Sequence, residues 1–319
     1  CFVWMLFITG TIFSQTNDTG TTCANFLKIG VDARALGMGG AAVGLKGNVM
    51  AVHWNPAVIG AISDVELGFM HNQYILDMSH EFAGFAVRMG PTFVLGISAS
   101  YFNAGTLTKT ERIAPGEFAE TGDFNASDLA VYISMAQRIE DNFFIGLSVK
   151  PIFQTIGNYS SQTVGLDGGV LYFYKNFGVG FSVRNVGLGM AVKKNAFPLP
   201  IIISAGVSYK LASFITMTSE LEKPMDNKIN LKAGIEAQLL RLLYLRSGFT
   251  MGAKKNELGG NAGLALGMGF RVKNFHIDYA YNPKGFLGGS HRISLCYALE
   301  KNRQPELVIF PQPEIFSPD

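Results

Sequence analysis

The sequence has little charge, no excess of one sign of charge and, beyond its first residues, no long hydrophobic run. Charged residues make up 16% of its 319 positions, against roughly 25% in typical soluble domains. The balance of 26 Lys and Arg against 24 Asp and Glu gives no overall basic field for nucleic acid, and 48% hydrophobic residues exclude a disordered chain. A membrane-spanning helix needs roughly 18 consecutive apolar residues, which the body of the chain lacks. The other structure that satisfies every backbone polar group in lipid is a closed β-barrel, so the sequence predicts a β-barrel surrounded by membrane lipid.

Residue types that carry catalytic or metal chemistry are also scarce. The five His are scattered and none has a His or Cys partner at metal-ligand spacing. No G-x-S-x-G element is present either. We therefore expect no catalytic residue, no metal and no cofactor, and no enzymatic activity. Of the three Cys, Cys23 and Cys296 match no redox spacing, and whether they pair stays open.

The two ends of the sequence differ from its body. Residues 1–15 are uncharged and apolar and then turn polar, which is typical of a secretory signal peptide, here an incomplete one. We expect a flexible N-terminus and a lumenal hatch over 16–62, and a transmembrane β-barrel over 63–300. Residues 301–319 contain four Pro and are expected to form an extended periplasmic tail.

The body of the chain repeats stretches in which apolar residues alternate with small or polar ones. Within 200–210, Ile201 and Val207 share one face, whereas Gly206 and Lys210 share the other. A period of two indicates strands, and an apolar face opposite one of Gly, Ser, Lys and Arg indicates a transmembrane barrel with a polar interior. Fourteen antiparallel strands are predicted, at approximately 64–74, 79–89, 92–103, 127–139, 142–155, 162–174, 177–187, 199–210, 213–223, 228–239, 242–252, 261–272, 275–282 and 290–300.

The connections between these strands are mostly alternately tight and long, as in outer-membrane barrels. The longest predicted loop runs over 104–126, and 188–198 and 253–260 are further candidate extracellular loops. Three apolar residues on two of these loops are possible contacts for a partner: Phe118, Phe124 and Met190.

Residues 24–62 break the alternation and are rich in Gly and Ala. A fourteen-stranded barrel leaves a channel unless something fills it, and the inward positions of the strands are dominated by small residues. We therefore expect 24–62 to fill the lumen as a hatch. Gly37-Met38-Gly39-Gly40 lacks the context of a dinucleotide or Walker loop, so it indicates close backbone packing.

Charged residues at inward positions predict either a network that holds the hatch or a ladder that guides an anionic ligand. On the hatch, Arg34 and Asp32 are candidate partners for the wall. The inward cations are Lys150, Arg184, Lys210, Arg246, Arg271 and Arg292.

The hatch sequence carries a resemblance. The stretch 26–60, FLKIGVDARALGMGGAAVGLKGNVMAVHWNPAVIG, resembles the N-terminal signature of the PorV/PorQ family of outer-membrane proteins, which is similar to the FadL long-chain fatty-acid transporters. The resemblance implies a FadL-like, fourteen-stranded barrel with a hatch, in the outer membrane of a Gram-negative bacterium. The matching hatch residues include Arg34, Gly37, Gly39, Gly40, Trp54, Asn55, Pro56 and Ala57.

Two functions follow from this resemblance. The first is a component of type IX protein secretion, as a shuttle, attachment or translocon-partner subunit whose partners are secretion components or cargo C-terminal domains. The second is FadL-like transport of long-chain fatty acids or other hydrophobic small molecules. Which cargo or ligand is handled, whether the hatch moves and the oligomeric state stay open.

Overall fold

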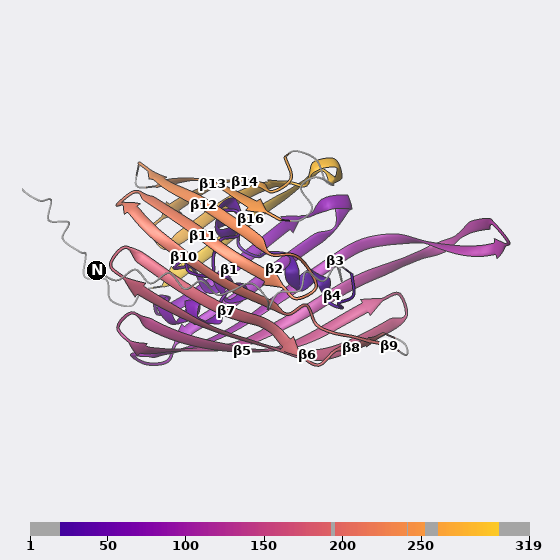
Figure 1. Cartoon of the computed structure of the whole chain (residues 1–319), viewed down its shortest axis with the longest axis horizontal. Helices are drawn as coiled ribbons and strands as arrows, with labels where there is room; N and C mark the ends of the chain where they lie inside the picture. Colours follow the sequence, from indigo (N-terminus) through magenta and orange to yellow (C-terminus); the bar gives the residue numbers. More distant parts are fainter. Residues whose placement is uncertain (1–19, 193–194, 241, 253–260, 300–319) are drawn as a thin grey trace, which may run out of the picture.

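The computed structural model describes residues 20–192, 195–240, 242–252 and 261–299. Within these ranges, fourteen antiparallel strands form a closed barrel (Figure 1), which confirms the predicted fold class. Consecutive barrel strands pair with each other, and the first strand closes the barrel against the last, with Val65 opposite Leu299. The predicted signal peptide, the tail and the loop 253–260 lie outside the described residues.

The barrel strands begin and end close to the predicted positions, except that β3 ends and β4 begins about ten residues beyond them. They are β1 (Val65–Gln73), β2 (Ser79–Arg88), β3 (Phe93–Ala114), β4 (Glu117–Glu140), β5 (Phe143–Ile156), β6 (Tyr159–Tyr174), β7 (Phe177–Gly187), β10 (Ile202–Ala212), β11 (Ile215–Pro224), β12 (Asn230–Leu239), β13 (Leu243–Met251), β14 (Leu264–Val272), β15 (Phe275–Pro283) and β16 (Gly289–Leu299).

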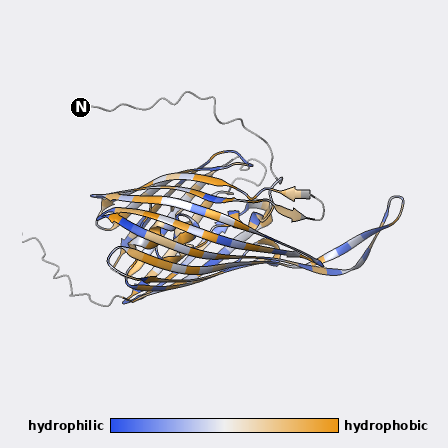
Figure 2. Cartoon of the chain, turned by 90° about the horizontal axis from the view of Figure 1, so that it is seen from below, coloured by the Kyte–Doolittle hydropathy of each residue, from blue (hydrophilic) through white to orange (hydrophobic). Residues whose placement is uncertain are grey.

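Alternation along each strand separates a lipid-facing surface from a polar interior. On β5, Leu147 and Val149 are 60% and 44% exposed, whereas Ser148 and Lys150 are each 2% exposed. Hydrophobic bands cover much of the barrel wall (Figure 2). Aromatic side chains pair across neighbouring strands where the connections are tight, as in the stacked rings of Phe177 and Tyr209, 4.5 Å apart. This arrangement fits an outer-membrane barrel with an aromatic girdle.

One predicted loop is a β-ribbon instead. Residues 104–126, expected as the longest loop, continue β3 and β4 beyond the barrel as a paired hairpin (Figure 1). Backbone pairing continues there because the sequence alternates β-forming residues and closes in a tight turn, where Gly116 has φ +87°. We call 104–126 the ribbon. Phe118 is 68% exposed on it, whereas Phe124 is half-buried.

A second hairpin corrects the expectation for Met190. Strands β8 (Met190–Val192) and β9 (Asn195–Phe197) form a separate two-stranded sheet at the end of the barrel that carries the ribbon. Met190 is 0% exposed there and belongs to an apolar cluster with Cys23 and Leu199. It is therefore not an exposed contact residue, since the hairpin folds it inward.

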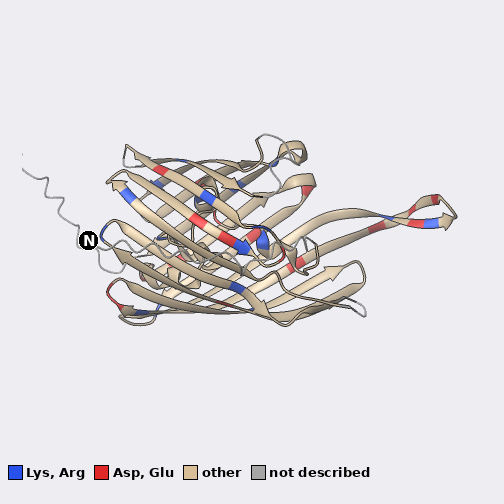
Figure 3. Ribbon diagram, in the orientation of Figure 1, with Lys and Arg blue, Asp and Glu red and all other residues tan. Residues whose placement is uncertain are grey.

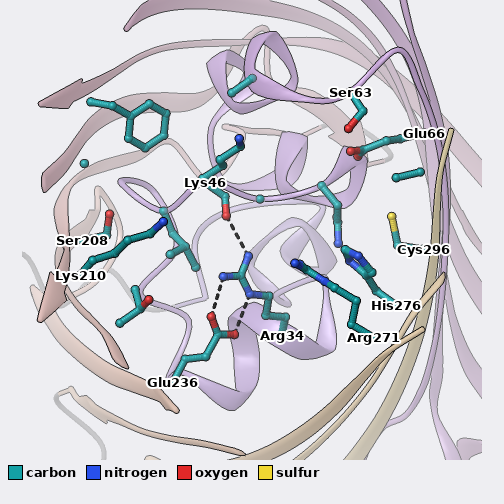
Figure 4. A pocket seen from close by; sticks show the side chains of 18 of the residues that line it. Arg34, Lys46, Ser63, Glu66, Ser208, Lys210, Glu236, Arg271, His276 and Cys296 are labelled. Carbon is teal, nitrogen blue, oxygen red and sulfur yellow. Dashed lines mark hydrogen bonds and ion pairs between the residues drawn. The ribbon is translucent and has the colours of Figure 1, made fainter. Parts of the chain in front are cut away.

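The barrel interior is filled by residues 24–62, which we call the plug (Figure 4). Its helices are η1 (Asn25–Lys28), α1 (Ala33–Gly37), η2 (Val49–His53) and η3 (Pro56–Ala61), where η denotes a 3₁₀ helix. Two more, η4 (Ile75–Asp77) and η5 (Gly285–Leu287), lie in connections between barrel strands.

Among the described residues, no helix is both long and apolar enough to cross a membrane.

Pairs of glycines on opposite strands make room for the plug backbone. Gly146 and Gly169 face each other across β5 and β6, and a Cβ on Gly146 would lie 2.3 Å from the amide nitrogen of Ala57. Gly180 and Gly206 do the same across β7 and β10, where a Cβ on Gly180 would lie 2.0 Å from the carbonyl oxygen of Val43. Gly234 and Gly248 form a further such pair, whereas Gly68 and Gly84 face each other against plug side chains.

The glycine contacts generate a prediction. Gly180→Ala places a methyl group against plug backbone that cannot rotate away, so we expect the free energy of unfolding to fall by about 1–3 kcal/mol. Denaturant unfolding of the purified barrel in detergent measures this change. The matched control is Gly90→Ala in the β2–β3 turn, where a Cβ meets nothing within 4 Å. Equal stability of the two variants would contradict the close approach of plug and wall.

Candidate functional site: the plugged lumen and its two openings

The Trp54-Asn55-Pro56-Ala57 element holds the plug against the wall. The amide of Asn55 donates hydrogen bonds to the carbonyl oxygens of Val43, at 2.9 Å, and of Val170 on β6, at 3.0 Å. Its side-chain oxygen accepts from the backbone N–H of Ala57 and so caps η3, whose first residue is Pro56. One side chain thus joins two parts of the plug to the barrel.

Two cations of the wall lie close to the ring of Trp54. Its indole N–H donates to the carbonyl oxygen of Val31 at 2.9 Å. The guanidinium of Arg184 and the ammonium of Lys232 lie 5.5 and 5.0 Å from its ring, within range of cation–π attraction. Arg184 also donates to the carbonyl oxygen of His53. The indole is therefore fixed by both charge and packing.

Two acidic residues of β11 neutralise these cations. Glu222 pairs with Arg184 at 3.0 Å and with Lys232 at 2.6 Å. Glu220 pairs with Lys232 and accepts the backbone N–H groups of Ala42 and Val43 through one oxygen, at 2.8 and 2.9 Å. These carboxylates satisfy plug backbone that would otherwise be buried without partners.

A second cluster joins α1 of the plug to β12, β13 and β15. Arg34 donates two hydrogen bonds of 2.8 Å to the carboxylate of Glu236 and a third to the carbonyl oxygen of Lys46 (Figure 4). Arg246 bridges Glu236 and Asp278, at 2.7 Å each. Ion pairs thus join the plug to the wall at these residues.

A third cluster lies nearer the ribbon end. Lys150 pairs with Asp167 at 2.8 Å and also contacts the side chain of Asn185. Its ammonium lies 4.8 Å from the ring of Tyr132, whose hydroxyl is 3.1 Å from Nδ1 of His53. Burial, together with the cations nearby, holds the pKa of His53 well below its ordinary value, so that its imidazole is neutral near pH 7.

A polar cavity of about 860 Å³ opens at the tight-turn end; we call it the vestibule. Arg34, Lys46 and Ser63 line it from the N-terminal part of the chain, and Lys210 and Arg271 line it from the wall (Figure 4). Tight turns of outer-membrane barrels face the periplasm, so the vestibule faces the periplasm.

A smaller cavity of about 520 Å³ lies at the ribbon end, and we call it the apolar pocket. Its lining is mainly hydrophobic and aromatic, with a few polar side chains that include one carboxyl and two amide groups. It shares no lining residue with the vestibule among the described residues. The residues concerned include Phe26, Ile29, Tyr74, Phe102, Phe197, Asp128 and Gln154.

The remaining predicted cations have different surroundings. Lys210 and Arg271 line the vestibule and form no ion pair within the described part of the chain, whereas Arg292 is buried and donates to the side chain of Asn282. The free thiols of Cys23 and Cys296 are both buried. Cys23 contacts Pro198 at the ribbon end and Cys296 lines the vestibule, so the two do not pair.

Sequence reasoning did not identify Glu220 and Glu222. Both flank the outward-facing Leu221 on β11. The same alternation that located the other lumen charges would therefore have identified them as inward-facing. Asp32 was expected to pair with the wall as a charge. Instead it accepts the backbone N–H of Arg34 and a hydrogen bond from the Ser294 hydroxyl.

Gly39 and Gly40 of the plug have φ of +70° and +74°, which favours glycine. A Cβ on Gly39 would lie 2.7 Å from the backbone nitrogen of Phe249, and one on Gly37 would lie 3.1 Å from the Cα of Gly267. The glycine run therefore makes close backbone contacts. In the part of the chain that the structure describes, no three His, Cys, Asp or Glu side chains gather as a metal site.

The burial of Asp32 generates a pH prediction. Burial, and then the charge of Asp278, raises the pKa of Asp32 to about 6. The folded state thus favours the protonated carboxyl, and the stability that this provides is lost as pH rises from about 4 through 6. Asp32→Asn keeps the acceptor but not the charge, so we expect it to raise the free energy of unfolding at pH 7.5 by up to about 3 kcal/mol. The gain should vanish at pH 4.

Denaturant titrations at the two pH values measure this difference. The matched control is Asp77→Asn, an exposed residue in η4. A gain that is equal at both pH values would show that Asp32 does not titrate as inferred.

Solved structures with the same fold include channels and transporters. The "CymD monoaromatic hydrocarbon channel" shares 12% identity over 86% of this chain and 99% of its own, with a TM-score of 0.63. The Pseudomonas putida toluene transporter TodX has a TM-score of 0.61 at 12% identity, over 86% and 99% of the two chains. A Pseudomonas aeruginosa FadL homologue has a TM-score of 0.54 at 11% identity, over 84% and 98%. The FadL-like fold is therefore confirmed.

No curated protein matches the chain. A family model does match it over residues 51–297, and its description is type IX secretion system membrane protein PorP/SprF. The expected membership of the PorV/PorQ family is therefore wrong. The resemblance depended on the stretch 26–60, most of which precedes the matched residues. The Gly and Asn-Pro elements of that stretch pack the plug closely against the wall. The chain belongs to the PorP/SprF family of type IX secretion system membrane proteins, in the outer membrane of a Gram-negative bacterium.

Proposed function

We propose that this barrel serves type IX secretion as a shuttle, attachment or translocon-partner subunit. Its lumen does not carry the cargo, and it contacts its partner outside the membrane. The projecting ribbon is the observation that carries this proposal. It extends two paired strands well beyond the barrel (Figure 1), and charged residues of both signs gather toward its tip (Figure 3).

The filled lumen favours a subunit that binds its partner outside the barrel over one that conducts an exported protein through its lumen. The plug is joined to the wall by backbone contacts at glycines and by ion pairs on several strands. An exported protein would need to displace all of these contacts to pass through. Binding at the ribbon requires no such displacement.

The ribbon tip offers hydrophobic contacts for a partner. Ile113 and Phe118 are 63% and 68% exposed there, on opposite strands of the hairpin. Buried aromatic anchors commonly contribute much of the binding energy at protein interfaces. We propose a cargo C-terminal domain or a translocon subunit as the partner.

Removal of these side chains tests the proposal. We expect Ile113→Ala with Phe118→Ala to weaken recovery of the translocon or cargo C-terminal domains on the tagged barrel by about tenfold or more, since anchor residues each contribute about 2 kcal/mol. The matched control is Leu76→Ala with Phe286→Ala, two side chains that are 70% and 88% exposed in other connections at the same end. Equal recovery with both double variants would contradict the ribbon as the partner site.

The apolar pocket favours a second candidate, the binding of a hydrophobic small molecule. Phe26, Ile29, Phe102 and Phe197 line the pocket, and its volume of about 520 Å³ is within the range of small-molecule sites. The FadL-like neighbours support this alternative, on which the pocket takes a fatty acid or an aromatic hydrocarbon.

A pocket-filling variant tests the alternative. Ile29→Trp should reduce binding of a fluorescent fatty acid at least tenfold, because the larger side chain occupies the cavity. Leu76→Trp, at an exposed position outside the pocket, is the control. Unchanged binding in the Ile29 variant would remove the pocket as the site.

A further inference from the structure

The vestibule concentrates positive charge in a chain that is nearly neutral. Its described lining includes nine Lys or Arg residues and four Asp or Glu residues, whereas the whole chain has a formal net charge of +2. Two of the four acids, Glu236 and Asp278, are already paired with Arg34 or Arg246. The remaining charge is therefore strongly positive.

Several of these cations have no carboxylate partner among the described residues. Arg88 donates to the carbonyl oxygens of Gly60 and Ile62, and Arg138 donates to that of Pro91. Arg271 lies 5.4 Å from the ring of Tyr244. Carbonyl and ring contacts fix the direction of a guanidinium but leave its charge uncompensated, so it remains available to an anion.

The unpaired cations surround the opening. Arg88 and Lys210 lie on β2 and β10, which are separated by six steps around the fourteen-strand barrel, nearly its full width. Lys210 and Arg271 lie on opposite sides of the central Arg34 (Figure 4). Lys175 and Lys273 add charge at two of the tight turns. No small anion reaches across such a ring, whereas an extended chain with several negative charges does.

We propose that the vestibule is a docking site for an acidic polypeptide segment presented from the periplasm. Carboxylates spaced along such a segment would pair with Arg88, Arg138, Lys210 and Arg271, and the volume of about 860 Å³ admits part of a polypeptide chain. Arg guanidinium groups suit this role because their fork of donors matches a carboxylate. The site is distinct from the ribbon, so it adds a periplasmic partner to the extracellular one.

The test measures binding of a fluorescent oligo-glutamate peptide to the full chain in uncharged detergent. We expect Lys210→Gln with Arg271→Gln to weaken binding about tenfold or more, and raised salt to weaken it further, because exposed ion pairs are screened. Neither side chain has an ion-pair partner among the described residues, so the barrel should fold normally. The matched control is Lys228→Gln with Lys284→Gln, which removes two cations at the ribbon end.

Four results would overturn the proposal. Absence of binding, or equal weakening by both double variants, would show that the vestibule is no site. Displacement of the peptide by equimolar inorganic triphosphate would assign the cations to small anions. A chain that ends at Leu299 and binds the peptide at least tenfold more tightly would assign the vestibule to residues 300–319 of this same chain. The proposal of a separate partner is supported if Lys210→Gln with Arg271→Gln weakens binding as expected, triphosphate does not displace the peptide, and the chain that ends at Leu299 binds no more tightly.

Discussion

The close approach of plug backbone to barrel wall is the constraint on which the rest of the structure depends. At Gly146, Gly180 and Gly248, a single methyl group would lie within 2.3 Å of a plug backbone atom. Cross-strand glycine pairs open the wall at these points, and the plug backbone occupies the space. Since the plug must lie this close, its own polar groups need partners on the wall, which the inward side chains supply.

The charged side chains of the lumen are arranged to satisfy the plug that is packed against them. Glu220 accepts two plug amides, and Arg34 donates to Glu236 from within the lumen. Charges buried in a barrel are costly unless they are paired, and most of those around the plug are paired. The exception is the vestibule, where cations such as Lys210 and Arg271 face water without a carboxylate partner among the described residues. The two openings of the lumen thus differ in chemistry, one apolar and one basic.

The period of two in the sequence was sufficient to predict the barrel, its fourteen strands and the inward cations. It could not reveal that glycines such as Gly180 and Gly206 face each other, because register is set by pairing between strands. Nor could it distinguish a polar loop from a paired ribbon at 104–126, where exposed strands carry Thr, Lys and Glu like a loop. Met190 was misjudged because a connection can fold back over the mouth of a barrel. The family was misjudged because the plug motif reflects packing, which does not distinguish one plugged barrel from another.

The chain is a filled barrel, not an open one, in a family of secretion-system membrane proteins. It separates the lipid-facing wall, which anchors the protein, from the ribbon and the vestibule, which face the two aqueous compartments. The most direct test of a filled lumen is the conductance of the purified chain in a planar bilayer. We expect no steady open-pore current from the intact protein, because the plug closes the lumen. A stable, porin-like conductance would contradict it.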